Sequence, residues 1–172
     1  VSEKLNFRPA QFYKEQHVRG KWVCDQCDTL TQQAMPAYVI DKGIASPELL
    51  SHVLVSKYAD HLPLYRQRLI YQRAGIELSR STLSDWIGRC GVELEPLANA
   101  LKEVVLQQRV IHADETPVTI MRMGENEKKP KKGYVWAYAT TQYNPVQAVI
   151  YDFQDSRSGQ HAEEFLKGWQ GY

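Results

Sequence analysis

The chain has 172 residues and a formal net charge of +1, and 43% of its residues are hydrophobic while 24% are charged. These values are ordinary for a soluble protein of one or two domains, and no apolar run reaches the ~18 residues that span a bilayer. Three cysteines are too few for a secreted disulfide framework, so we expect a cytoplasmic protein without a membrane partner.

The first segment, residues 1–45, is expected to be irregular or β-rich, and it contains Cys24 and Cys27 in the spacing C-x-x-C. This spacing supplies half of a tetrahedral zinc site, and no second pair of ligands has a convincing spacing. Free structural thiols and a redox dithiol are the alternatives, although the neighbouring Asp25 would disfavour a thiolate. The cysteine pair therefore predicts a zinc half-site, with both alternatives open.

The second segment, residues 46–108, is expected to be helical throughout. Ser46 is a good N-cap, and Pro47 suits the first helical position because its missing N–H would be unpaired there in any case. Pro63 is expected to start a second helix, which Gly75 should end. Four separate helices are predicted in this segment.

The third of these helices follows a glycine-bearing turn, and Ser79 or Ser81 is expected to cap it. The second and third helices together, residues 69–89, resemble a helix-turn-helix. The outward positions that could contact DNA phosphates or base edges are Arg80, Ser84 and Arg89. Plain helix packing is the alternative. A fourth helix is expected from the apolar spacing between Leu94 and Val104.

The third segment, residues 109–172, changes to strand patterns. Strands are expected at residues 110–113, 134–139 and 146–153, and a helix at residues 160–169. A polar loop separates the first two strands, and its basic residues are candidates for binding DNA phosphates: Lys128, Lys129, Lys131 and Lys132. The order strand, strand, strand, helix predicts a partial α/β core that lacks later strands.

Asp114 directly follows the first predicted strand, and the pair Thr116-Pro117 is expected to end that segment. A carboxylate held by a strand suits Mg²⁺, which prefers oxygen ligands. Two-metal phosphoryl transfer needs several such groups around ions about 3.5–4 Å apart, so one aspartate is not enough. Glu115 should point to the opposite face of the strand, whereas His112 should share the face of Asp114. Alternatively, Asp114 only caps the turn at Thr116.

Several stretches of the chain are similar to transposases of the insertion sequence 66 family, a family of bacterial mobile elements. The most specific stretch is the block from Leu54 to Gln67, LVSKYADHLPLYRQ. The other matching stretches are Asp41-Lys42-Gly43, residues 78–86 (LSRSTLSDW), residues 112–117 (HADETP), residues 159–161 and residues 168–172. The resemblance covers essentially the whole chain.

The resemblance implies an α+β protein in three parts: a zinc-finger-like remnant (residues 1–45), a helix-turn-helix-like region (residues 46–108) and a partial RNase H-like catalytic core (residues 109–172). It also implies a DDE-type active site, in which Asp114 is the first ligand of Mg²⁺ or Mn²⁺. The second Asp is expected beyond Tyr172 and the Glu further on, so we expect a truncated segment that is inactive alone. Cys24 and Cys27 match only the second cysteine pair of the zinc-binding segment.

The function implied for the parent protein is DNA cleavage and strand transfer during transposition. Its partners are then the DNA ends of the element, the target DNA and further copies of the same chain in a synaptic complex, close to the nucleoid. The alternative is a DNA-binding module without catalytic activity, which would rest on the helix pair and the cysteine pair.

Overall fold

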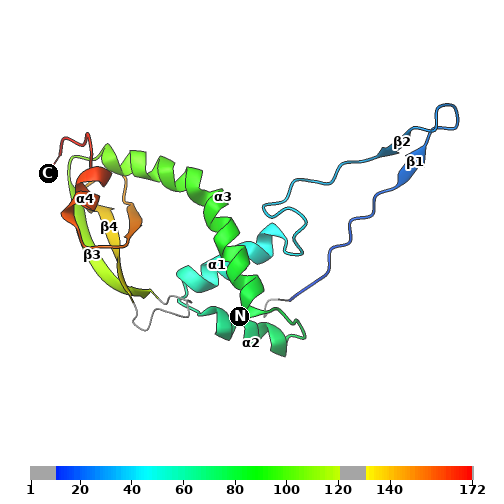
Figure 1. Cartoon of the computed structure of the whole chain (residues 1–172), viewed down its shortest axis with the longest axis horizontal. Helices are drawn as coiled ribbons and strands as arrows, with labels where there is room; N and C mark the ends of the chain where they lie inside the picture. The colour runs from blue at the N-terminus through cyan, green and yellow to red at the C-terminus, as the bar shows by residue number, and fades with distance from the viewer. Residues whose placement is uncertain (1–10, 121–130, 172) are drawn as a thin grey trace, which may run out of the picture. The chain divides into compact units, whose positions relative to one another are not determined.

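The computed structural model describes residues 11–120 and 131–171 (Figure 1). These residues form helices and two small antiparallel sheets, which confirms the predicted α+β class. The chain divides into two compact units, residues 1–93 and residues 94–172. Each unit has its own hydrophobic core.

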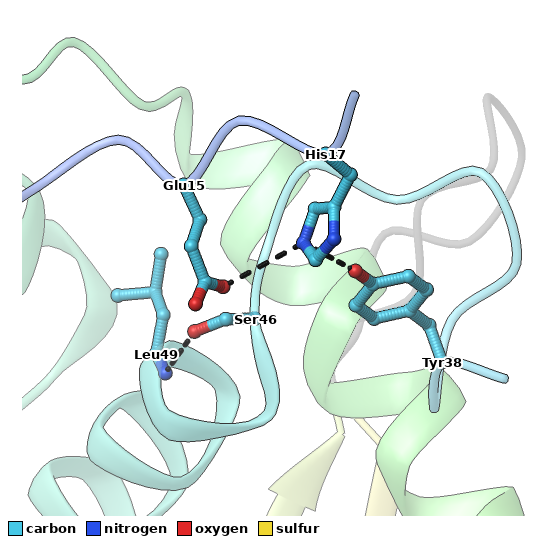
Figure 2. Close-up of polar contacts among 5 residues, drawn as sticks. All are labelled: Glu15, His17, Tyr38, Ser46 and Leu49. Carbon is cyan, nitrogen blue, oxygen red and sulfur yellow. Dashed lines mark hydrogen bonds and ion pairs between the residues drawn. The ribbon is translucent and has the colours of Figure 1, made fainter. Parts of the chain in front are cut away.

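The first unit begins with a two-stranded hairpin, β1 (Lys21–Val23) and β2 (Leu30–Gln32), in which Lys21 pairs with Gln32. The described part of residues 1–45 is otherwise without strands or helices, which agrees with the expectation of an irregular or β-rich segment. The chain segments that flank the hairpin are tied together where Tyr38 Oη lies 2.7 Å from His17 Nε2 (Figure 2). Glu15 lies 3.8 Å from the same nitrogen.

Helix α1 (Pro47–Tyr58) starts as the sequence predicts. The backbone N–H of Leu49 donates to Ser46 Oγ at 3.3 Å, and Pro47 occupies the first turn (Figure 2). Helix α2 (Leu64–Arg73) begins after Pro63 and is followed by Gly75 at a φ of 82°. Glycine adopts this left-handed conformation without steric cost, which explains the break at this position.

Helix α3 (Arg80–Leu106) corrects the prediction of separate third and fourth helices, because it is one continuous helix with Pro96 inside it. Proline removes a single backbone N–H from the helical ladder, and the flanking residues continue the helix on both sides. Ser79 is the capping residue, since its Oγ accepts from the N–H of Thr82 at 2.9 Å.

The core of the first unit joins α1, α2 and the first part of α3. Its largest fully buried side chains include Tyr71, Leu83 and Val53. Cys90 is also buried there, with 3% of its surface exposed. Cys90 is therefore a core residue of the first unit.

The second unit contains the strands β3 (Ile111–Ile120), β4 (Lys131–Thr140) and β5 (Val149–Gln154), followed by α4 (Gly159–Phe165). The strand order is β3-β4-β5, and both pairings are antiparallel. The predicted order of three strands and a helix is confirmed. The predicted helix 160–169 is too long at its C-terminal end, because the chain turns after Leu166 and Gly168 has a φ of 85°.

The predicted end of the first strand is wrong, because β3 continues through Pro117 to Ile120. Among the residues that the structure describes, β3 pairs only with β4, and it is therefore an edge strand of this sheet. Proline is tolerated at an edge because the strand has one side on which no ladder hydrogen bond is required.

The two faces of this sheet differ. One face forms the core of the second unit with the end of α3 and with α4, and the rings of Tyr138 and Phe165 stack there with centroids 3.7 Å apart. Side chains alternate between the faces along each strand. Asp114 pairs with Ala137, between Trp136 and Tyr138 of the covered face, and so it lies on the opposite, open face.

Candidate metal and DNA-binding residues

Asp114 is exposed on the open face of β3. Its Oδ1 accepts a hydrogen bond from the backbone N–H of Glu115 at 2.9 Å, which helps to orient the carboxylate. The turn that Asp114 was alternatively expected to cap does not form, because Thr116 and Pro117 lie within the strand. The structure therefore leaves Asp114 on a solvent-accessible surface without that local role.

His112 is exposed and shares the face of Asp114 by strand alternation. Within residues 11–120 and 131–171, however, no three histidine, cysteine, aspartate or glutamate side chains gather closely enough to hold a metal ion. Asp114 offers an oxygen ligand that fits Mg²⁺ or Mn²⁺, but the part of the chain that the structure describes does not complete a site.

Glu115 projects from the other face of β3, as its position next to Asp114 predicts. Its Oε1 accepts from Arg157 Nε at 2.5 Å, a contact between β3 and the segment that precedes α4. The hydrogen bond to Glu115 and the charge of that carboxylate raise the pKa of Arg157. This guanidinium therefore stays charged at every physiological pH.

The predicted basic loop is described only in part, because Lys128 and Lys129 lie outside the described residues. Lys131 Nζ donates to Asp155 Oδ2 at 2.8 Å, and this bond lowers the pKa of Asp155. Lys132 is the next residue of β4, is exposed, and lines a pocket together with Arg157. The two described lysines thus lie in different electrostatic surroundings.

Cys24 and Cys27 are exposed in the turn of the β1–β2 hairpin. The N–H of Asp28 donates to the carbonyl of Cys24 at 2.9 Å, which holds the turn closed. Cys27 Sγ lies 3.1 Å from Thr29 Oγ1, and hydrogen bonds from Thr29 and then from Cys24 lower the pKa of the Cys27 thiol. A lowered thiol pKa favours the thiolate, the form that binds metals.

The predicted outward residues of the helix-turn-helix-like pair, Arg80, Ser84 and Arg89, are all exposed on α3. Arg89 Nε donates to Asp85 Oδ2 at 2.9 Å within the same helix. A pocket of about 490 Å³ lies at the junction of the two helices, and its lining residues are Arg68, Gln72, Glu77, Leu78, Ser79 and Arg80.

Arg157 is the charged residue near Asp114 that sequence reasoning did not select. It is 42 residues away from its partner Glu115, and no local motif marks it. Only the pairing of β3 with β4, and of β4 with β5, brings the two residues together.

A protein-family model described as "Transposase IS66 family" matches residues 42–172. The chain belongs to the IS66 transposase family. The match includes α1 to α4, with Asp114, Glu115 and Arg157, and excludes the hairpin that carries Cys24 and Cys27. The expected resemblance is therefore confirmed, and it supports a function related to transposition.

Three proteins of Sinorhizobium fredii (strain NBRC 101917 / NGR234) are similar to this IS66-family chain over 99% of its length. Their names are uncharacterized proteins y4qI, y4jD and y4hP, and the identities are 37%, 36% and 30%. The chain spans only 32%, 34% and 31% of their respective lengths. No solved structure matches the chain. Among the described residues, no helix is both long and apolar enough to cross a membrane.

Proposed function

We propose that this chain supplies the first metal-binding strand of an RNase H-like, DDE-type transposase core. The single observation that carries the proposal is the exposed Asp114 on the open face of an edge strand, in a chain that belongs to the IS66 family. The order β3-β4-β5-α4 supports the RNase H-like assignment, since such a half-sheet accepts further strands beside β3.

Mg²⁺ or Mn²⁺, when held in part by Asp114, would activate water and would neutralise charge that develops on the attacked phosphodiester. Asp114 contributes one oxygen ligand, and the β3–β4 ladder holds its backbone in place. In the parent protein, the reaction is cleavage of DNA at the end of the element, followed by attack of the freed 3′-hydroxyl on target DNA.

A metal titration tests the role of Asp114. Paramagnetic Mn²⁺ should broaden the amide NMR signals of His112, Asp114 and Thr116 at millimolar concentration, and Asp114→Asn should abolish the broadening. Asp152→Asn is a matched control, because Asp152 pairs with Trp136 and so lies on the other face. Equal broadening in Asp114→Asn and in the unchanged chain would contradict the proposal.

A cleavage assay tests the expectation that the 172-residue chain is inactive by itself. The described residues bring no three metal-binding side chains together, and one carboxylate does not hold a pair of ions. We expect no cleavage of a DNA duplex with Mg²⁺ or Mn²⁺. Metal-dependent cleavage that disappears in Asp114→Asn would overturn this expectation.

Cys24 and Cys27 are proposed to supply one half of a zinc site in a zinc-finger-like segment. The support is the closed hairpin turn and the lowered pKa of Cys27. Zn²⁺ added in excess should bind weakly through these two thiols, measurable by mass spectrometry under native conditions, and Cys27→Ser should lower the zinc content. The same zinc content in Cys27→Ser would leave free thiols or a redox pair as the explanation.

The second candidate function is a DNA-binding module without catalysis. The observation that favours it is the exposed row Arg80, Ser84 and Arg89 on α3, beside the pocket at the α2–α3 junction. A gel-shift titration with salt that shows sequence preference, lost in Arg80→Ala and Ser84→Ala, would support this candidate. For both candidate functions, we propose that several copies of the chain assemble on DNA at the nucleoid.

A further inference from the structure

A second pocket lies on the covered face of the β3-β4-β5 sheet, beside the strand that carries Asp114. Its volume is about 300 Å³, and its lining residues are Glu115, Pro117, Lys132, Tyr134 and Arg157. Two cations and one carboxylate line it, so its formal charge is positive. All five residues belong to the same compact unit.

Glu115 orients the guanidinium of Arg157 at this pocket. Arg157 Nε donates to Glu115 Oε1, while the terminal nitrogens of the guanidinium carry further N–H donors. The Glu115 side chain is only 16% exposed, whereas that of Arg157 is 70% exposed. An ion pair with one such exposed partner contributes little to folding stability, so its main effect is to orient the guanidinium.

Lys131 and Lys132 provide a comparison within the same strand. Lys131 bonds to Asp155, whereas Lys132 lines the pocket with Arg157 and Tyr134. An oriented guanidinium, an ammonium group and a phenol are donors that suit the oxygens of a phosphate.

We propose that Arg157 and Lys132 bind one backbone phosphate of DNA in this pocket, and that Glu115 is the positioning residue that holds Arg157. The proposal rests on the transposase function proposed above, and it adds a DNA contact at the strand that carries Asp114, on the face of Glu115. Such a contact fixes the position of the DNA backbone and carries no sequence information.

Salt-dependent binding of a labelled DNA duplex to the full chain tests the contact. The double variant Lys132→Gln/Arg157→Gln should weaken binding about tenfold and reduce the slope of log Kd against log salt by about 1, because one phosphate contact is lost. The control Arg109→Gln/Lys167→Gln removes the same charge at exposed positions outside the pocket and should keep the slope. Equal slopes in the two double variants would overturn the proposal.

A phosphate titration of the unchanged chain needs no variant and no DNA. Inorganic phosphate should shift the Nε–Hε NMR signal of Arg157 but not that of Arg19, whose guanidinium donates to the carbonyl of Gln33 at 2.8 Å outside the pocket. An unmoved Arg157 signal would refute the pocket even if DNA bound elsewhere. A shifted Arg157 signal without DNA binding would keep the pocket and count against the proposed transposase role.

The role of Glu115 is tested by two substitutions. If Glu115 only repelled phosphate, Glu115→Leu would tighten DNA binding, because it removes a negative charge from the pocket. Positioning predicts the reverse: Glu115→Leu weakens binding several-fold, and Glu115→Gln, which keeps an acceptor for Arg157 Nε, restores it. Tighter binding in Glu115→Leu would contradict the positioning role.

Discussion

Two neighbouring acidic residues of β3 have different surroundings because a strand alternates its side chains. Asp114 is exposed on the open face, whereas Glu115 bonds to Arg157 on the other face. The alternation could be predicted from sequence, and it correctly separates the two carboxylates. The contact of Glu115 with Arg157 could not be predicted from sequence, since it depends on how β3, β4 and β5 are arranged.

Tyr138 provides a prediction at the residue scale. Its side chain is fully buried, its hydroxyl lacks a hydrogen-bond partner among the described residues, and burial followed by the charge of Asp152 raises its pKa to about 12. The neutral phenol is therefore favoured in the folded state, and this stability is fully present below the unfolded pKa of about 10. Unfolding free energy should fall by on the order of 2 kcal/mol as the pH rises from about 10 to 12.

Urea denaturation at several alkaline pH values measures this loss. Tyr138→Phe should remove most of it, and it should cost little stability at neutral pH because it also removes an unpaired buried hydroxyl. Tyr151→Phe, at an exposed position on the open face, should behave like the unchanged chain. An unaltered alkaline dependence in Tyr138→Phe would show that another group causes it.

At the scale of elements, the starts of helices were better predicted than their ends. Ser46 and Pro47 start α1, and Ser79 caps α3, because capping needs only contacts within a few residues. Pro96 and Pro117 did not end their elements. A proline is tolerated in a strand at the edge of a sheet, and local sequence does not show which strand will lie at the edge.

Gln67 links two elements and gives a prediction at this scale. It is completely buried on α2, and its Nε2 donates to the carbonyls of Val53 on α1 and Leu62 in the turn, at 3.2 and 3.1 Å. Its Oε1 accepts from Tyr71 Oη at 3.0 Å. Gln67→Leu should therefore leave buried polar groups unpaired and reduce the free energy of unfolding by about 2 kcal/mol.

Chemical denaturation followed by circular dichroism measures the effect of Gln67→Leu. Gln72→Leu makes the same chemical change at an exposed position of α2 and should alter stability by less than about 0.5 kcal/mol. Similar midpoints for the two variants would mean that the buried hydrogen bonds of Gln67 contribute no net stability.

At the scale of the whole molecule, the open face of the sheet is notable for its apolar side chains. Tyr151 and Phe153 of β5 are 66% and 55% exposed, and Val149 is 38% exposed. By strand pairing they lie on the same face as Asp114. Exposed apolar patches of this kind promote association, so the chain expressed alone should self-associate at high concentration.

Light scattering as a function of concentration tests this expectation. Tyr151→Lys should reduce the association severalfold without lowering the melting temperature, because the side chain is already largely in solvent. Tyr143→Lys, at an exposed position in the turn between β4 and β5, should leave the association unchanged. Equal reduction by both variants would point to a general charge effect.

The sequence by itself determined the α+β class, the starts of α1 and α3, the succession of three strands and a helix along the chain, and the family, because these depend on short-range periodicity, capping and matching blocks of residues. The tertiary structure decided which face of β3 is covered, where β3 ends, and that Glu115 and Arg157 meet. Those features depend on pairing between strands far apart in the chain. A short stretch of sequence contains only one residue of each such contact, so the contact can be identified only once the fold is known.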